Sequence, residues 1–257
     1  MATGTAGTGI RLVARADDLG SVMSANRAIV EVLDAGLVRN ASLMAPALFA
    51  GHAADFLAHR REFCIGLHAT INSEWDNLRW GPSLPPADVP SLVDSRGYLC
   101  QTIREQKERG IDPKDVMREV AAQLKVARRM GFDIRYADTH MGWTWLAEGL
   151  AETFDGWCRK EGLVNGDRAC PSLPRDPRGA LSADGIRRGL EAAAPGTYLV
   201  VGHPGNDDAE MRALGHEGYP GERVAAERDG DRRALSDPGL MAWCRANTVT
   251  PLRFDEI

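Results

Sequence analysis

Several predicted strands of this chain are followed by residues of the types that bind metals or transfer protons. They are Asp17-Asp18, His68, Asp138 with His140, and His203. Two neighbouring carboxylates at the end of an apolar run could not both be buried and ionised without a cation or other donors. One carboxylate and two imidazoles form a three-ligand set that leaves metal positions open for water and substrate. We therefore expect Asp18, His68 and His140 to bind one divalent ion, zinc before magnesium, because an O,N,N set suits zinc best.

The other polar residues at these strand ends are candidates for proton transfer. Asp17 is free to act as a base or to orient a ligand, and His203, on a different strand, could donate a proton. Asp138 precedes His140 by two positions and so points the same way on a strand. Taken singly, these residues also have ordinary explanations, as turn residues, helix N-terminal anions or core histidines. Their recurrence at four strand ends favours a working site.

The elements that would position these residues alternate between strand and helix. Patterning predicts strands at residues 12–18, 41–45, 64–67, 134–137, 197–201 and 248–252. Helices are predicted at residues 25–35 with Ser24 as N-cap, and at 51–61, 113–130, 145–161, 183–194 and 238–246. This alternation implies parallel strands whose carboxyl ends share one face. No glycine-rich dinucleotide fingerprint follows the first strand, so we expect a single-domain distorted (β/α) barrel, similar to a TIM barrel, rather than an open sheet.

Long irregular segments interrupt the alternation at residues 72–110, 170–179 and 206–236. In the first, aromatic residues such as Trp75 favour an ordered loop, and in the last we expect only a helical turn near residues 222–228. These loops would wall the cleft at the carboxyl ends of the strands. Residues 1–9 are predicted to be a flexible lead-in to one domain at 10–257. His52, His59 and His216 are interpreted as surface residues.

The composition narrows the class of protein. The chain has 257 residues, 44% of them hydrophobic, and a formal net charge of −5. Its acidic balance argues against a nucleic-acid partner, and no apolar run is long enough for a membrane span. Five scattered cysteines without a CxxC pair indicate reduced thiols in a cytoplasmic protein.

Four short motifs follow one another in the order and spacing of a known family. Ala16-Asp17-Asp18-Leu19-Gly20, Gly66-Leu67-His68, Asp138-Thr139-His140 and Gly202-His203-Pro204-Gly205 resemble the YdjC/ChbG-like carbohydrate deacetylases. The resemblance covers nearly the whole chain. It implies a distorted barrel and metal-dependent removal of N-acetyl groups from amino sugars such as chito-oligosaccharides. It also implies that Asp18, His68 and His140 bind the metal, that Asp17 is the catalytic base, and that His203 is the acid.

The chain departs from the family pattern at three places. Met141-Gly142-Trp143-Thr144 stands where many members have further histidines, Leu19 where Phe is usual, and Arg15 where Asn is frequent. The first departure reshapes the pocket beside the metal and leaves the particular sugar open.

We expect a metal-dependent amidohydrolase that deacetylates a small N-acetylated sugar, with Trp143, Trp75 and Asp138 contacting the substrate. Alternatives are another metal-dependent sugar enzyme, such as an isomerase or a phosphoester hydrolase, or a sugar-binding protein without catalysis. A homodimer is left open.

Overall fold

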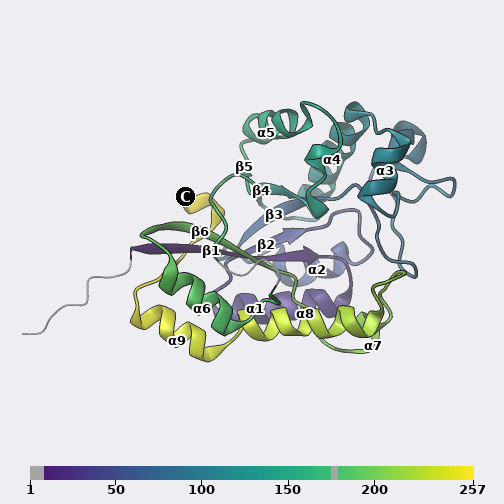
Figure 1. Cartoon of the computed structure of the whole chain (residues 1–257). Coiled ribbons are helices and arrows are strands. Elements are labelled where there is room, and N and C mark those ends of the chain that lie inside the picture. The colour runs from purple at the N-terminus through teal and green to yellow at the C-terminus, as the bar shows by residue number, and fades with distance from the viewer. Residues whose placement is uncertain (1–8, 175–178) are drawn as a thin grey trace, which may run out of the picture.

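A parallel sheet organises the fold of the described residues, 9–174 and 179–257 of this computed structural model (Figure 1). The strands follow the order β5-β4-β3-β2-β1-β6, and β7 pairs with β1 beside this path. Every pair between these strands is parallel. The strands are β1 (Ile10–Leu19), β2 (Asn40–Leu43), β3 (Cys64–Ala69), β4 (Ile134–Thr139), β5 (Val164–Asn165), β6 (Gly196–Gly202) and β7 (Thr250–Pro251). Residues 1–8 of the predicted lead-in and residues 175–178 of the predicted irregular segment 170–179 lie outside the described residues.

The sheet curls until the chain beyond β5 reaches the opposite edge strand. There Leu199 of β6 donates its backbone N–H to Pro171 at 2.8 Å and accepts from Leu173 at 2.8 Å. These bonds form a parallel bridge between Ser172 and Leu199. The result is a distorted (β/α) barrel, which confirms the predicted fold class.

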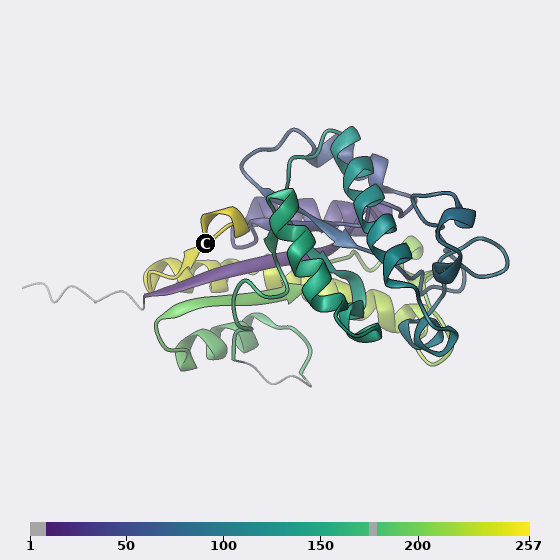
Figure 2. The same cartoon turned by 90° about the horizontal axis from the view of Figure 1, so that it is seen from above.

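Helices surround this sheet (Figures 1 and 2). Helices α1 and α8 lie side by side beneath the strands in Figure 1, whereas α4 and α5 lie above them and nearest the viewer in Figure 2. The α-helices are α1 (Met23–Ala35), α2 (Ala50–Leu57), α3 (Ile103–Arg109), α4 (Pro113–Arg129), α5 (Leu150–Glu161), α6 (Ala183–Ala192), α7 (Ala209–Arg212), α8 (Gly221–Leu235) and α9 (Pro238–Ala246). Short 3-10 helices are η1 (Pro86–Asp88), η2 (Pro90–Leu92), η3 (His140–Leu146) and η4 (Phe254–Glu256). None of the helices in the described ranges combines the length and apolar character that a bilayer crossing requires.

Local capping signals located several helices correctly. The Asp112 side chain accepts from the Lys114 amide at the start of α4, with Pro113 at the first helical position, and α9 has the predicted bounds. The predicted N-cap of the first helix was wrong. Ser24 lies inside α1, and the carboxylate of Glu210 in α7 accepts from the amides of Met23 and Ser24 at 3.1 and 2.7 Å. This cap comes from 187 residues further along the chain, so no local pattern shows it.

The predicted long loops contain more structure than their composition indicated. Trp75 and Trp80 are buried, which confirms order in the first, but α3 also falls within it. The segment 206–236 was wrongly predicted as a loop, because α8 spans 15 of its residues. The exposed side chains of α8 are polar and form ion pairs, such as the one between Arg223 and Glu227 one turn apart. The sequence of this helix therefore shows no clear helical repeat of apolar residues.

Helix α5 begins later than predicted. Met141 and Gly142 both have positive φ angles, which turn the chain sharply after His140. Residues up to Leu146 form η3, and α5 starts at Leu150 after Gly149. The sequence 145–149 therefore belongs to the turn that follows β4 and not to the helix.

Gly66 on β3 offers a test of how tightly the strands that present the site are packed. A Cβ at Gly66 would overlap the ring of Tyr136, which is fully buried, hydrogen-bonded to Ser42 at 2.9 Å and packed against Phe254. We expect Gly66→Ala to lower the free energy of unfolding by about 1–3 kcal/mol in urea denaturation. Gly51→Ala is the matched control, because nothing lies within 4 Å of its added methyl group. Equal stability of the two variants would show that Tyr136 can give way.

Candidate metal centre

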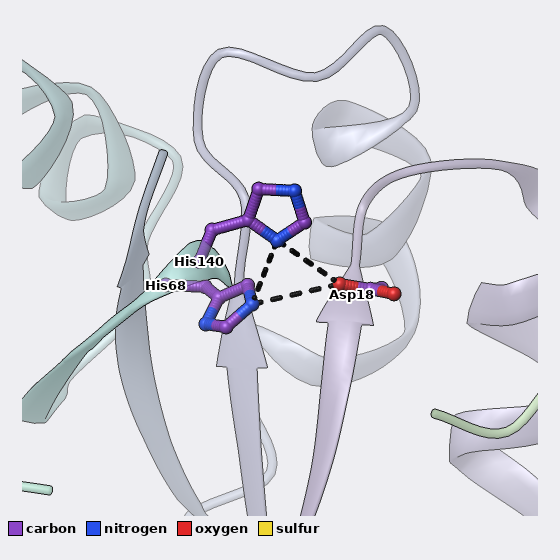
Figure 3. Close-up of side chains that lie close together, drawn as sticks. All are labelled: Asp18, His68 and His140. Atoms are coloured by element: carbon purple, nitrogen blue, oxygen red, sulfur yellow. Dashed lines mark hydrogen bonds and ion pairs between the residues drawn. The ribbon is translucent and has the colours of Figure 1, made fainter. Parts of the chain in front are cut away.

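Three side chains from different strands converge at the carboxyl end of the barrel (Figure 3). Asp18 lies at the end of β1, His68 in β3, and His140 directly after β4. Asp18 Oδ1 is 3.5 Å from His68 Nε2 and 3.5 Å from His140 Nδ1, and these two nitrogens are 3.1 Å apart. All three residues are buried, with exposed fractions of 6%, 3% and 5%. The structure thus brings the three predicted ligands together.

In each histidine, the ring nitrogen that points away from Asp18 is hydrogen-bonded to a carboxylate. His68 Nδ1 lies 2.8 Å from Asp138 Oδ1, and His140 Nε2 lies 3.1 Å from Glu74 Oε2. A neutral imidazole that donates from one nitrogen presents the lone pair of the other. His68 therefore directs Nε2, and His140 directs Nδ1, toward Asp18.

The atoms that face one another match the requirements of a divalent cation. Asp18 Oδ1 is buried and accepts no hydrogen bond. Three electron-rich atoms in contact need a positive charge between them. For metal–ligand distances of about 2.0–2.1 Å in a tetrahedral site, ligand atoms are about 3.3–3.4 Å apart. The observed separations of 3.1–3.5 Å fit that spacing.

An irregular strand end brings both Asp17 and Asp18 into the same cavity. Successive residues of a regular strand point to opposite faces. Here the register between β1 and β2 shifts between Ala16 and Leu19, and Asp18 adopts a left-handed φ of 67°. The Asp18 carbonyl accepts from the Ser21 amide and hydroxyl at 3.1 and 2.7 Å, which stabilises the turn. Strain of this kind persists where surrounding contacts enforce it.

Arg228 of α8 determines which oxygen of Asp18 is free. Its guanidinium lies 2.6 Å from Asp18 Oδ2, leaving Oδ1 for the two histidines. Burial alone would raise the pKa of Asp18, but Arg228 and the neighbouring His140 and His68 together outweigh burial and hold this pKa well below its usual range. Asp18 therefore remains a carboxylate, with one oxygen committed to an ion pair and one directed toward the histidines.

Asp17 belongs to a second charged cluster with its own cation. Arg15 donates Nε to Asp17 Oδ1 at 2.6 Å and Nη2 to Oδ2 at 2.8 Å, while its Nη1 lies 2.5 Å from Asp138 Oδ2. Asp17, His68 and Asp138 also have the mutual spacing of a metal site. Because the Arg15 guanidinium already supplies a positive charge to both carboxylates of this group, Asp18, His68 and His140 are the better metal candidates.

One cavity of about 400 Å³ adjoins both Asp residues and the two histidines. Its wall also includes Trp75 and His203, whose side chain is 44% exposed. The His203 amide donates to Asp231 Oδ2 at 2.8 Å, which anchors the backbone after β6. The structure therefore places Asp17 and His203, the predicted base and acid, around the same cavity as the three candidate ligands.

Two residues predicted to contact substrate do not line this cavity. Trp143 is fully buried, donates its indole N–H to the Ala69 carbonyl at 2.7 Å and packs edge-on against Phe154. The turn after His140 directs it into the core. Asp138 is also fully buried, and its oxygens are bonded to His68, Arg15 and Ser42. Asp138 orients His68, so both substrate assignments are corrected.

Sequence reasoning missed several residues of the cavity wall. Glu74 lies in the predicted irregular segment 72–110 and Arg228 in the segment 206–236, which was predicted as a loop, so no pattern in the sequence indicated that either side chain faces the cavity. His216 is exposed, as predicted, yet it lines the cavity and stacks on Trp75 with ring centroids 6.1 Å apart. Asp76, next to Trp75, bonds through its amide to the Gly215 carbonyl at 2.9 Å, so the two segments support each other.

The carboxylates that surround His68 and His140 raise the pKa values of both side chains. Burial would lower the pKa of His68, but the carboxylates of Asp138 and Asp17 raise it well above its usual value. Burial likewise opposes protonation of His140, while Glu74 and Asp18 raise its pKa to about 9. Without a cation at the centre, protons would supply the positive charge that the carboxylates favour.

Known proteins resemble this chain over most of its length. A family model described as YdjC-like protein matches residues 11–246. A carbohydrate deacetylase of Thermoanaerobacter pseudethanolicus is 23% identical, with 93% of this chain and 95% of that protein aligned. A carbohydrate deacetylase of Geobacillus stearothermophilus is 31% identical over 50% of this chain and 48% of its own length. A crystal structure from Enterococcus faecalis, described as that of a candidate cellobiose-phosphate cleavage protein, has the same fold, with a TM-score of 0.78, 17% identity and coverage of 96% and 98%.

The raised pKa of His140 predicts how stability depends on pH. A pKa of about 9 in the folded chain, above the ordinary histidine pKa of 6.5, gives a stabilisation that is complete below pH 6.5 and lost as the pH rises through 9. Chelator-treated protein should therefore lose of the order of 3 kcal/mol of unfolding free energy between pH 6.5 and 10 through this residue. Denaturation in urea at each pH measures it, and His140→Gln should remove this part of the slope while His59→Gln retains it. Identical slopes for wild type and His140→Gln would contradict the assignment.

The bond between Glu74 and His140 predicts an effect on metal affinity. Glu74→Gln weakens the partner that directs Nδ1 toward the centre, so zinc affinity should fall about 10- to 100-fold. Competition with a fluorescent chelator measures that affinity. Glu108→Gln, whose side chain is 65% exposed on α3, is the matched control and should bind zinc as wild type does. Unaltered affinity in Glu74→Gln would argue against His140 as a ligand.

Proposed function

The chain belongs to the YdjC-like family, and on that premise we propose that it removes the N-acetyl group from an amino sugar or short oligosaccharide. The observation that carries this proposal is the convergence of Asp18, His68 and His140, whose ligand atoms face one another beside an Asp18 Oδ1 that accepts no hydrogen bond. Asp17 and His203 line the same cavity. The aligned relative from Thermoanaerobacter, which this chain matches over 95% of that protein, is named a carbohydrate deacetylase.

We assign zinc to the three-residue cluster, because two imidazoles and one carboxylate oxygen suit it better than magnesium. A divalent ion there would polarise the acetyl carbonyl and make an attacking water more acidic. The other steps fall to the chain's own residues. Because Arg228 engages Asp18 Oδ2, only one oxygen of that carboxylate is available as a ligand, and positions stay open for water and substrate.

We assign Asp17 the role of base. Burial would raise the pKa of Asp17, but Arg15 and His68 lower it overall, so the side chain is ionised at neutral pH. The paired bonds from Arg15 fix its orientation beside the ligand cluster. Asp17 would accept the proton of the attacking water as the water oxygen bonds to the acetyl carbon.

We assign His203 the role of acid. The amide nitrogen is a poor leaving group until it is protonated. His203 reaches the cavity from β6, on the other side of β1 from the strands that carry His68 and His140. Protonated His203 would give its proton to the nitrogen as the carbon–nitrogen bond breaks, releasing acetate and the free amino sugar.

Asp17→Asn tests the function and the base together. The variant should retain zinc binding, because Asp17 is not among the proposed ligands, while acetate release from N-acetylated sugars falls about 10²- to 10⁴-fold. Asp133→Asn, whose side chain is 43% exposed, is the control and should be fully active. Metal content and acetate are measured on the same samples, with and without chelator.

Undiminished turnover in Asp17→Asn would reject the base assignment. Formation of an isomer or of phosphate in place of acetate by the wild type would reject deacetylation and favour another metal-dependent sugar enzyme.

A further inference from the structure

The turn after β4 forms one side of the cavity at the metal centre. Thr139, His140, Met141 and Gly142 all line this cavity of about 400 Å³. Met141 and Gly142 adopt left-handed φ angles of 57° and 64°, which a residue with a side chain keeps only where surrounding contacts enforce it. Asn72, itself fully buried, donates Nδ2 to Met141 Sδ at 3.0 Å. Met141 is therefore a fixed part of the cavity wall, although 56% of it is exposed.

The side chains that this turn presents beyond and before His140 are apolar or already hydrogen-bonded. Met141 offers carbon and sulfur, and the Thr139 hydroxyl donates to Asp167 Oδ2 at 2.8 Å. Gly142 has no side chain, and nothing lies within 4 Å of a Cβ added there. The turn thus borders open space, and none of these three side chains has a free hydrogen-bond donor for a ligand.

The reaction proposed above fixes the direction of the substrate amide. Its carbonyl must lie beside the three candidate ligands, and its nitrogen must lie within reach of His203. His203 follows β6, whereas the turn follows β4, across the barrel, with β1, β2 and β3 between the two strands. A planar amide carries its nitrogen and its acyl chain on opposite sides of the C=O bond. The acyl chain therefore extends away from His203, toward Met141 and Gly142.

We propose that the turn of Met141 and Gly142 binds the acyl part of the substrate and admits acyl chains longer than acetyl, such as propanoyl and butanoyl groups. This proposal rests on the proposed hydrolysis of an N-acylated amino sugar. The step is the same: water bonds to the acyl carbon, and the carbon–nitrogen bond breaks as the nitrogen is protonated. The products are the longer carboxylate and the free amino sugar. Each added methylene leaves water for contact with Met141, which raises kcat/KM up to about fourfold.

The length of the acyl chain and variants of the turn test this proposal together. The probes are N-acetyl-, N-propanoyl- and N-butanoylglucosamine, with kcat and KM measured for each on the zinc-loaded chain. Wild type should hydrolyse the butanoyl sugar with at least the kcat/KM of the acetyl sugar. Gly142→Asn fills the open space with a residue that tolerates a left-handed φ, and Met141→Asn removes apolar surface. Each should lower the butanoyl-to-acetyl ratio of kcat/KM about tenfold.

Gly149→Asn is the matched control. Gly149 also has a left-handed φ, of 73°, and nothing within 4 Å of an added Cβ, but it does not line the cavity of the metal centre. It should keep the wild-type ratio, and circular dichroism checks that every variant retains its helices. A wild type that hydrolyses only the acetyl sugar would overturn the proposal. A ratio that neither turn variant lowers, or that Gly149→Asn lowers equally, would also overturn it.

Failure of the proposed function gives a different result. If wild type releases a carboxylate from none of the three sugars, the hydrolysis is rejected. Calorimetric titration of the zinc-loaded chain with acetohydroxamate and butanohydroxamate, which bind zinc through their oxygens, then decides the acyl site alone. Tighter binding of the longer hydroxamate by wild type and Gly149→Asn, but not by Gly142→Asn, would support it, whereas equal affinities of wild type for both would overturn it.

Discussion

The site depends on three buried ligand atoms that face one another, namely a carboxylate oxygen that accepts no hydrogen bond and two imidazole nitrogens 3.1 Å apart. Asp18 Oδ1 meets His68 Nε2 and His140 Nδ1 at 3.5 Å each. Such an arrangement is unfavourable in a protein interior unless a positive charge is present. A carboxylate behind each histidine and Arg228 behind Asp18 keep the free atoms turned inward. Protons can supply the charge, as the raised pKa values of His68 and His140 indicate, but the geometry equally fits one divalent ion.

Two arginines separate the tasks of the neighbouring aspartates. Arg15 engages both oxygens of Asp17 and also pairs with Asp138, whereas Arg228 engages one oxygen of Asp18. Both carboxylates can lie in one cavity because Asp18 adopts a left-handed conformation. In a regular strand the side chains of neighbouring residues would point to opposite faces of the sheet. Removal of either guanidinium would leave a buried carboxylate without its counter-charge, which is strongly destabilising. The same cations that balance the interior therefore also fix the orientation of the reacting groups.

The sequence allowed prediction of features that depend on local signals and common strand polarity. The bounds of α9, the start of α4 and the gathering of Asp18, His68 and His140 are of this kind, since parallel strands end at one face. Features that depend on packing between distant segments could not be predicted. Glu74 and Arg228 reach the cavity only because two long segments fold back over it, and α8 has too polar a surface to show a helical period. The burial of Trp143 depends on the positive φ angles of the two residues before it, which composition does not reveal.

Anomalous X-ray diffraction from crystals grown with zinc would show whether Asp18, His68 and His140 bind one metal ion. We expect one zinc peak, at about 2.0–2.2 Å from Asp18 Oδ1, His68 Nε2 and His140 Nδ1. The absence of a peak there, or a peak between Asp17 and Asp138 in the place of the Arg15 guanidinium, would contradict it.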